Sequence, residues 1–347
     1  MADGTARMPR PSDPVLRTFA GLAASVLIFA ALREAASVFV PATFALFIIA
    51  VVWPLQRTLQ RVLPKPVALL LTLVTALIAV IFVVFLMSWG FTRLGQWAVA
   101  NAGRFQDAYK RYAVWLDGHG VPAAGLIADT FDMRWLVWMA QGVTGQVRGL
   151  FSFMTVTLIF VMLGLLEVEV CCRNLLRIGR EPDSRFLAAS AEIAGKMQTY
   201  MIIRTIMSAV TGIAVWAFAS TVGLDLPLEW GVIAFAMNYI PFLGPLVATL
   251  FPSLFAILQF GSWEMPVAVF LCLNIVQFLS GSVIEPRLAG RALSVSPFLV
   301  LFAVFFWAFL WGIAGAFIGV PITIAALTLA ARYDATRGIS DLLSGRA

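Results

Sequence analysis

The chain contains several long runs without a charged side chain, and these runs limit what it can fold into. About twenty apolar residues are enough to cross a bilayer as a helix. Runs that are apolar throughout do not match the alternating pattern of membrane-barrel strands. The sequence therefore predicts an all-α polytopic membrane protein. The runs without Asp, Glu, Lys or Arg are Ala35–Gln56, Pro66–Thr92, Thr205–Leu224, Trp230–Trp263, Met265–Ile284 and Ala292–Ala331.

Composition and charge agree with a membrane protein and exclude several other classes. The chain is 61% hydrophobic and 12% charged, whereas soluble proteins are about half apolar and a quarter charged. The net charge of +6 fits basic cytoplasmic loops, so we expect no nucleic-acid partner. Cys171, Cys172 and Cys272 lack metal-type spacing, and His119 has no visible second ligand. Because the sequence also lacks a GxxxxGK phosphate loop and a nucleophile–base pair, we predict no enzyme activity, metal or cofactor.

Six segments have the length of full spans, at about residues 16–32, 38–53, 67–89, 150–166, 202–222 and 266–282. The turn with Arg57, Arg61 and Lys65 is basic, and the loop with Asp225 and Glu229 is acidic. The positive-inside rule therefore predicts cytoplasmic N- and C-termini. We divide the chain into residues 1–90 (three spans and the basic turn), 91–149 (a small external helical insert), 150–200 (a span and a cytoplasmic helical loop), 201–331 (the transport core) and 332–347 (a cytoplasmic tail).

Two further apolar stretches, residues 230–263 and 292–331, have lengths that fit no simple crossing. At 1.5 Å per residue, straight helices of these lengths would reach roughly 50–60 Å, against a hydrocarbon core of about 30 Å. Helix breakers lie near the middle of both stretches. We predict that each is a broken, re-entrant helical hairpin. With hairpins, Gly261–Glu264 is external and Glu285–Arg291 cytoplasmic, and each hairpin follows a full span with opposite topology, as in an inverted repeat.

The first broken stretch reads NYIPFLGPLVATLFP, from Asn238 to Pro252. Broken backbone at membrane depth is tolerated where it is buried in protein or lines a cavity, and transporters use it to present polar backbone groups to a solute. A simple kinked span is the alternative, since Gly and Pro are common in membrane helices. We predict a solute path lined by Asn238, Tyr239, Pro241, Gly244 and Pro245, together with Gly312 and Gly315 of the second stretch.

The span between the two stretches carries polar side chains at helical spacing. Asn274, Gln277 and Gly281 share a face, with Ser280 beside it. We add Asn274, Gln277 and Ser280 to the predicted path, although hydrogen bonds between helices are an equal alternative. Glu285–Pro286–Arg287 ends the span as either an interfacial ion pair or a gate. The predicted spans have no central carboxylate, which gives proton-coupled antiport little support.

Three segments, NYIPFLGPLVATLFP, IEPRLAGRALSVSPFLVLF and WGIAGAFIGVPI, resemble the autoinducer-2 exporter family, also called PerM-like permeases. The resemblance in order and spacing covers most of the chain, but its motifs are specific only from about Asn238 onward. It implies a multipass bacterial inner-membrane permease, and it implies homo-oligomers. Some members export small signalling molecules, and others exchange sodium for protons. The family motifs fall on Asn238, Pro241, Gly244, Pro245, Glu285, Pro286, Gly290, Pro297, Gly312, Gly315 and Pro321, of which Glu285, Pro286, Arg287, Gly290, Pro297 and Pro321 are predicted gate or structural positions.

The sequence thus predicts an inner-membrane permease or exporter that moves a small polar solute, such as an autoinducer-2-like signalling molecule. Its expected partners are the lipid bilayer, a small-molecule or ion substrate, and further copies of itself. A cation–proton antiporter is the first alternative, and a membrane scaffold without transport is the second.

Overall fold

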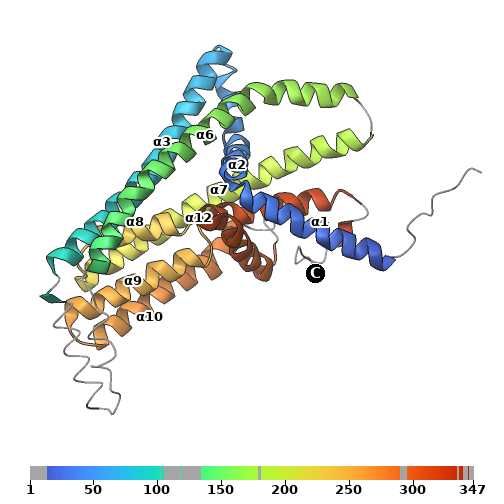
Figure 1. The fold of residues 1–347 in the computed structure, drawn as a ribbon. Coiled ribbons are helices and arrows are strands. Elements are labelled where there is room, and N and C mark those ends of the chain that lie inside the picture. The colour runs from blue at the N-terminus through green and yellow to red at the C-terminus, as the bar shows by residue number, and fades with distance from the viewer. Residues whose placement is uncertain are drawn as a thin grey trace, which may run out of the picture.

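The computed structural model describes residues 14–101, 134–178, 181–289 and 295–333, and positions 103, 104, 118, 336–338 and 343. Every regular element in this part of the chain is helical (Figure 1), which confirms the all-α class. Seven of the described helices are long and apolar enough to cross a membrane. The elements are α1 (Pro14–Glu34), α2 (Ala36–Leu59), α3 (Lys65–Ala100), α6 (Arg134–Ile178), α7 (Glu181–Val222), α8 (Pro227–Met237), α9 (Leu243–Phe260), α10 (Glu264–Phe278), the π-helix η1 (Leu279–Ile284), α11 (Glu285–Ala289) and α12 (Pro297–Ala330).

Helix α2 is longer than predicted, because Pro54 does not end it. The helix continues through Pro54 to Leu59. The hydroxyl of Thr58 donates to the Pro54 carbonyl oxygen at 2.8 Å, and the Arg57 guanidinium lies 5.5 Å from the centre of the Trp53 ring. These local contacts support the last turn despite the missing proline N–H.

The predicted insert of residues 91–149 is partly an extension of its neighbouring helices. Helix α3 continues past the predicted span end to Ala100, and α6 already begins at Arg134. Helices α6 and α7 also run on past the membrane spans and approach each other at residues 178 and 181, where Figure 1 shows their far ends side by side. The remainder of the insert, including His119, lies outside the described residues.

Helices α8 and α9 form the first predicted hairpin. The C-terminal end of α9 returns to the loop before α8, where the Gln259 side chain accepts from the backbone N–H of Asp225 and donates to the Gly223 carbonyl oxygen, both at 2.8 Å. Trp230 of α8 and Phe255 of α9 pack with ring centres 5.2 Å apart. The two arms therefore lie antiparallel, and the prediction of a hairpin in residues 230–263 is confirmed.

Helix α12 contains the second hairpin. Trp311 and Gly312 depart from helical geometry, with Gly312 at φ 63° and ψ −144°, a conformation open to glycine alone. On the far side of this break, Gly315 lies against Trp307, and Gly319 lies against Ala303 and Trp307. Residues four positions before and after residue 311 are in contact, and so are residues eight positions before and after it. This pattern is that of two antiparallel arms. The two arms of α12 (Pro297–Ala330) therefore form a second helical hairpin within the predicted stretch.

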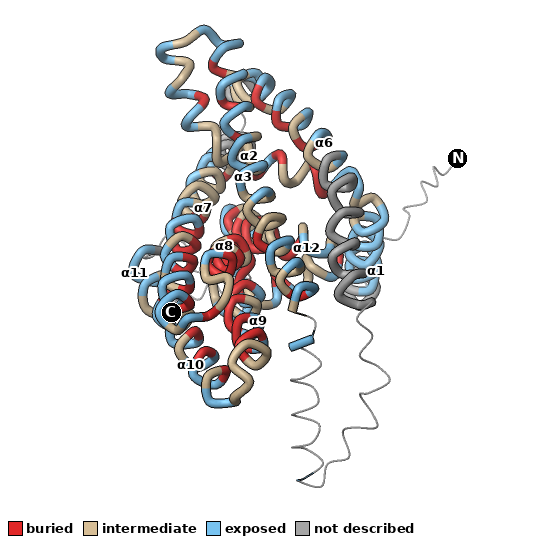
Figure 2. The backbone as a smooth tube through the Cα atoms, turned by 90° about the vertical axis from the view of Figure 1, so that its left-hand side faces the viewer, coloured by how far each residue is buried: buried red, intermediate tan, exposed pale blue. Residues whose placement is uncertain are grey.

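The two hairpins approach α7 from opposite ends. The base of the first lies beside Gly223, just after α7 ends. The base of the second lies near the start of the α7 span, where Lys196 donates to Thr328 at 3.0 Å and Arg332 pairs with Glu192. Figure 2 shows many of the buried residues, in red, on α7, α8 and α9. The hairpins thus overlap in depth beside the middle of α7.

Candidate functional site

One face of α7 carries a buried strip of polar side chains. Tyr200, Arg204, Ser208 and Thr211 are spaced so that they lie on one helix face. Arg204 is 8% exposed, and Ser208 and Thr211 are fully buried. An arginine in this position is uncommon because a charged side chain within a membrane span is costly unless it faces a partner or water. The strip is therefore a candidate functional feature, and we call these four residues the α7 strip.

The tip of the first hairpin lies against the α7 strip. The Asn238 side-chain amide donates to the Ser208 hydroxyl at 3.4 Å, and the Tyr239 hydroxyl donates to Thr205 at 3.2 Å. At about 1.5 Å per residue, these contacts lie roughly 21–26 Å along α7 from its end at Val222. The tip therefore reaches most of the way through a hydrocarbon core of about 30 Å without crossing it.

The break in this hairpin is confined to residues 238–242, which is shorter than the predicted stretch. Phe242 has φ 62° and ψ −46°, a left-handed conformation that costs a side-chain-bearing residue about 1–3 kcal/mol. Pro241 precedes it, and the Pro241 carbonyl oxygen accepts from Leu243 at 2.7 Å. Pro245 does not break the chain, because it lies in the first turn of α9, where the backbone N–H needs no helical partner.

Because Gly244 has no side chain, the two arms can lie close together at this tip. A Cβ at this position would lie 2.3 Å from the Met237 carbonyl oxygen and 2.7 Å from the Asn238 Cα. No side chain fits at these distances, so only glycine allows α9 to start directly beside the end of α8.

The two hairpins meet at this tip. The rings of Tyr239 and Phe317 are stacked with centres 6.0 Å apart. Ile240 is buried in a cluster with Tyr200 and four residues of α12, namely Val304, Ala316, Val320 and Ile324. The structure therefore brings Tyr239 and Ile240 of the first tip together with the arms of the second hairpin, while Asn238 contacts α7 and Gly244 contacts the end of α8. Gly315 is buried between those arms, whereas Gly312 is exposed at their tip.

Helix α10 ends in a π-helix that was not predicted. The backbone N–H of Glu285 bonds to the Ser280 carbonyl oxygen, five residues earlier, and Ser280 is buried. The Glu285 carboxylate then pairs with Arg204, at 3.3 Å between Oε2 and Nη1. Glu285 therefore forms an ion pair with Arg204 instead of with Arg287, which is exposed.

The predicted amide face of α10 is divided by the fold. Asn274 is exposed, and its amide donates to the Phe270 carbonyl of its own helix at 2.8 Å. Gln277 is half-buried, and its Nε2 is buried without a hydrogen-bond partner among the described residues. Only Gln277 and Ser280 thus turn toward the protein interior.

The remaining predicted positions have structural roles or lie elsewhere. Pro286 is exposed, and Gly290 lies outside the described residues. Pro297 starts α12 after the N-cap Ser296, whose hydroxyl accepts from the backbone N–H of Leu299 at 3.2 Å. Pro321 is fully buried in the second arm. Across the part of the chain that the structure describes, no group of three or more His, Cys, Asp or Glu side chains could hold a metal ion.

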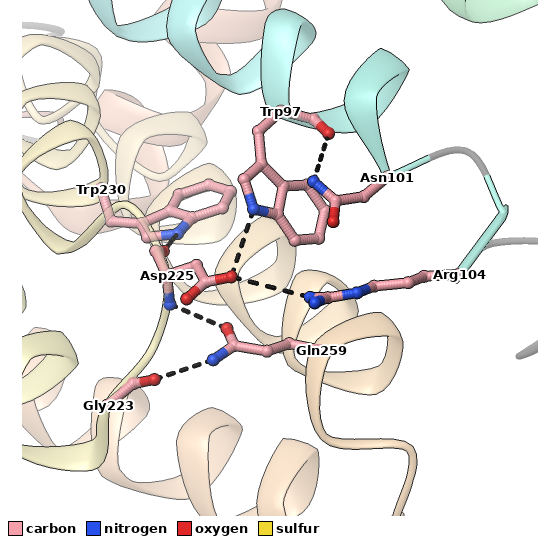
Figure 3. Close-up of polar contacts among 7 residues, drawn as sticks. All are labelled: Trp97, Asn101, Arg104, Gly223, Asp225, Trp230 and Gln259. Carbon is pink, nitrogen blue, oxygen red and sulfur yellow. Dashed lines mark hydrogen bonds and ion pairs between the residues drawn. The ribbon is translucent and has the colours of Figure 1, made fainter.

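A second polar cluster fixes the base of the first hairpin to α3 (Figure 3). The Asp225 carboxylate accepts from the Trp97 indole at 3.2 Å and lies 3.9 Å from Arg104. Its backbone bonds to Gln259 and to the indole of Trp230. Arg93 of α3 also pairs with the buried Glu229 of α8 at 3.1 Å. The hairpin base is therefore anchored, while its tip contacts α7 through fewer polar bonds.

Because Gln259 closes this base with two hydrogen bonds, replacing it by leucine should loosen the hairpin. We expect Gln259→Leu to lower the free energy of unfolding by about 1–3 kcal/mol, since each bond contributes about 0.5–1.5 kcal/mol. Thermal unfolding of the purified protein measures this. Gln60, which follows α2 at a distance from both hairpins, provides the matched control, Gln60→Leu. If the two variants unfold at the same midpoint temperature, Gln259 does not anchor the base of the first hairpin.

Comparisons with known proteins extend this description. The AI-2E family transporter profile matches residues 22–335. Over 321 residues the chain is 24% identical to the AI-2 transport protein TqsA of Escherichia coli, covering 92% of this chain and 93% of that protein. It is 25% identical over 319 residues to YhhT of Escherichia coli, which is provisionally named a transport protein, covering 91% of this chain and 90% of YhhT.

A protein of Borreliella burgdorferi, also provisionally named a transport protein, is 31% identical over 202 residues, or 58% of this chain and 56% of that protein. The family match spans both hairpins, the α7 strip and the π-helix. The chain belongs to the AI-2E family of transporters.

Proposed function

We propose that this multipass membrane permease exports a small polar solute, such as an autoinducer-2-like molecule, across the bacterial inner membrane. The solute passes along the α7 strip, between the tip of the first hairpin and the arms of the second. The name of the TqsA relative points to autoinducer-2 as one candidate. The proposal goes beyond family membership in naming a solute class, a direction and a route.

One observation carries the route. Two broken helices enter from opposite ends and overlap beside a buried polar strip, where Asn238 and Tyr239 bond to α7. Hairpins of this kind provide backbone polar groups at membrane depth and can rock against a fixed helix. The polar bonds at the first tip are few, and the 3.4 Å contact from Asn238 is long for a hydrogen bond. Separation of this tip from α7 therefore costs little compared with separation of the anchored base.

The antiporter alternative receives limited support from the same site. Glu285 is a carboxylate beside the route, but it is paired with Arg204. A transported cation would have to displace the Arg204 guanidinium from this carboxylate. A neutral solute imposes no such demand on the pair.

Transport by the purified protein in liposomes tests the proposal. We expect uptake of autoinducer-2 or of a small polyol to exceed that of empty liposomes, and imposed sodium and proton gradients are varied separately. Uptake of sodium driven by a proton gradient, with no solute flux, would favour the antiporter. The absence of any flux would favour the scaffold.

We also propose that the end of the molecule with Gly261–Glu264 is external and that the end with Arg287 and Arg291 is cytoplasmic. The supporting observation is that α10 and η1 separate Gly261–Glu264 from Arg287, the basic residue of α11. A membrane-impermeant thiol reagent applied to intact cells should label Ser262→Cys and spare Ala289→Cys. Labelling of Ala289→Cys alone would reverse this orientation.

A further inference from the structure

Arg204 and Glu285 form an ion pair that differs from the other ion pairs of the described residues. The Arg204 side chain is 10% exposed and the Glu285 side chain 29%. The basic partners of the other described pairs are between 26% and 72% exposed. Removing one partner of a buried pair leaves an uncompensated charge, so such pairs are kept only where both charges have a role or a well-matched environment.

The pair lies on the proposed route. Arg204 belongs to the α7 strip, directly next to Thr205, which accepts from Tyr239 at the first hairpin tip. The Arg204 guanidinium lies 5.7 Å from the centre of the Tyr200 ring, and this ring packs against the second hairpin. A solute that moves between the hairpin tips and α7 therefore passes this pair.

Hydrogen-bond donors around the pair are buried without a partner among the described residues. They are Nε of Arg204, the hydroxyls of Tyr200 and Thr211, and Nε2 of Gln277. Thr211 and Gln277 lie at a similar depth, because each is about two helical turns from the pair along its own antiparallel helix. A guanidinium can bind a carboxylate through two N–H groups. Here the Glu285 carboxylate accepts from Nη1 of Arg204, whereas Nε of Arg204 has no partner among the described residues.

We propose that the Arg204–Glu285 pair is the charge filter of the route and that it favours small uncharged solutes that carry hydroxyl or carbonyl oxygens. This inference rests on the proposed function. As it moves along the strip, a neutral hydroxylated solute can first accept from Thr211 and Gln277 and then accept from Arg204 and donate to Glu285, while the local net charge stays at zero. A charged solute adds an uncompensated charge at low dielectric, where Coulomb energies are several times larger than in water.

Single neutralisations of the pair test the filter. In proteoliposomes, uptake of erythritol is compared with uptake of erythronate, its carboxylate analogue, and of 1-amino-1-deoxyerythritol, its cationic analogue. We expect the wild type to prefer erythritol by about tenfold or more over both ions, since one unpaired charge at a few ångströms is worth over 1.4 kcal/mol. Arg204→Gln leaves Glu285 unpaired and should raise relative uptake of the cation about tenfold. Glu285→Gln should do the same for the anion.

Two further variants separate selectivity from folding. The double variant Arg204→Glu/Glu285→Arg keeps the net charge at zero and should keep the preference for erythritol. Arg93→Gln leaves Glu229 unpaired at the hairpin base, away from the tips, and should also keep this preference. Size-exclusion profiles and unfolding midpoints are measured for every variant.

Each result bears on the inference in a definite way. An active wild type that takes up either ion as fast as erythritol overturns it, and this comparison does not depend on any variant folding. Folded Arg204→Gln and Glu285→Gln proteins with unchanged selectivity also overturn it, while leaving the proposed transport function intact. A wild type that takes up none of the three probes contradicts both proposals.

Discussion

Replacement of Gly315 by alanine will prevent the second hairpin from closing. A Cβ at this position would lie 1.9 Å from the Trp307 carbonyl oxygen and 2.5 Å from the Trp307 carbonyl carbon. Overpacking in protein interiors costs about 1–3 kcal/mol when side chains can move. Here the contact is with the backbone of the other arm, so relief requires the two arms to separate, and we expect a loss above about 3 kcal/mol.

Thermal unfolding of the purified variant in detergent measures this loss, with size-exclusion chromatography as a second readout. The matched control is Gly95→Ala in α3, where an added Cβ would meet nothing within 4 Å. This control should gain up to about 1 kcal/mol, because alanine favours a helix more than glycine does. If Gly315→Ala unfolds at the wild-type midpoint, the arms of α12 do not pack as antiparallel neighbours.

Replacement of Asn238 by leucine will abolish most transport while leaving the protein folded. Asn238 is 7% exposed, and its amide bonds to Ser208 at the point where the first hairpin meets α7. The exchange removes a polar group from the route and adds an apolar side chain of similar size. The stability cost should be only about 1–3 kcal/mol, the usual cost of a lost buried hydrogen bond, whereas we expect flux to fall about tenfold or more.

Asn274 provides the control with the same chemical change. Its side chain is exposed on α10 and bonds to its own helix, so Asn274→Leu should leave flux and unfolding midpoint near those of the wild type. Proteoliposome uptake is compared at equal protein content. Equal losses of flux in both variants would show that amide side chains matter for transport anywhere in the spans. An Asn238→Leu variant with wild-type flux would show that Asn238 does not lie on the route.

The lengths of the apolar runs predict the fold well because the thickness of the bilayer fixes how many residues a crossing helix needs. Residues 230–263 and 292–331 fit neither one crossing nor two, and the glycines near 312 identify the second break. Prolines were less informative. Pro54 and Pro245 were both expected to interrupt helices, yet one is tolerated within α2 and the other lies in the first turn of α9. The effect of a proline depends on where its helix starts, which the sequence alone does not define.

The centre of the site was only partly predictable. The family motifs and the breaks identify Asn238, Tyr239 and Gly244, but Arg204 was missed because it stands at the edge of a charge-free run. Its i, i+4 spacing with Tyr200 and Ser208 was the available signal. Glu285 reaches Arg204 from 81 positions away in the chain, and the π-helix before it depends on hydrogen bonds that the sequence does not specify. Pairings of this kind follow from tertiary packing.

The central claim is that solute passes when the tip of the first hairpin separates from the arms of the second beside α7. Tyr239 and Phe317, whose rings stack across the two hairpins, are the residues with which to test it. In a background with Cys171, Cys172 and Cys272 replaced by serine or alanine, the pair Tyr239→Cys/Phe317→Cys is joined by a short bis-thiosulfonate reagent that a reductant cleaves. Each single-cysteine variant receives the same treatment as a control.

The measurement is solute uptake into proteoliposomes before cross-linking, after cross-linking and after reduction. The proposed route predicts that cross-linking stops the uptake that the double-cysteine protein shows before treatment, that reduction restores it, and that the reagent leaves the uptake of each single-cysteine protein at its own untreated rate. Uptake by the cross-linked protein at the rate of the uncross-linked protein would contradict the claim, because solute would then cross the membrane with the hairpins held together.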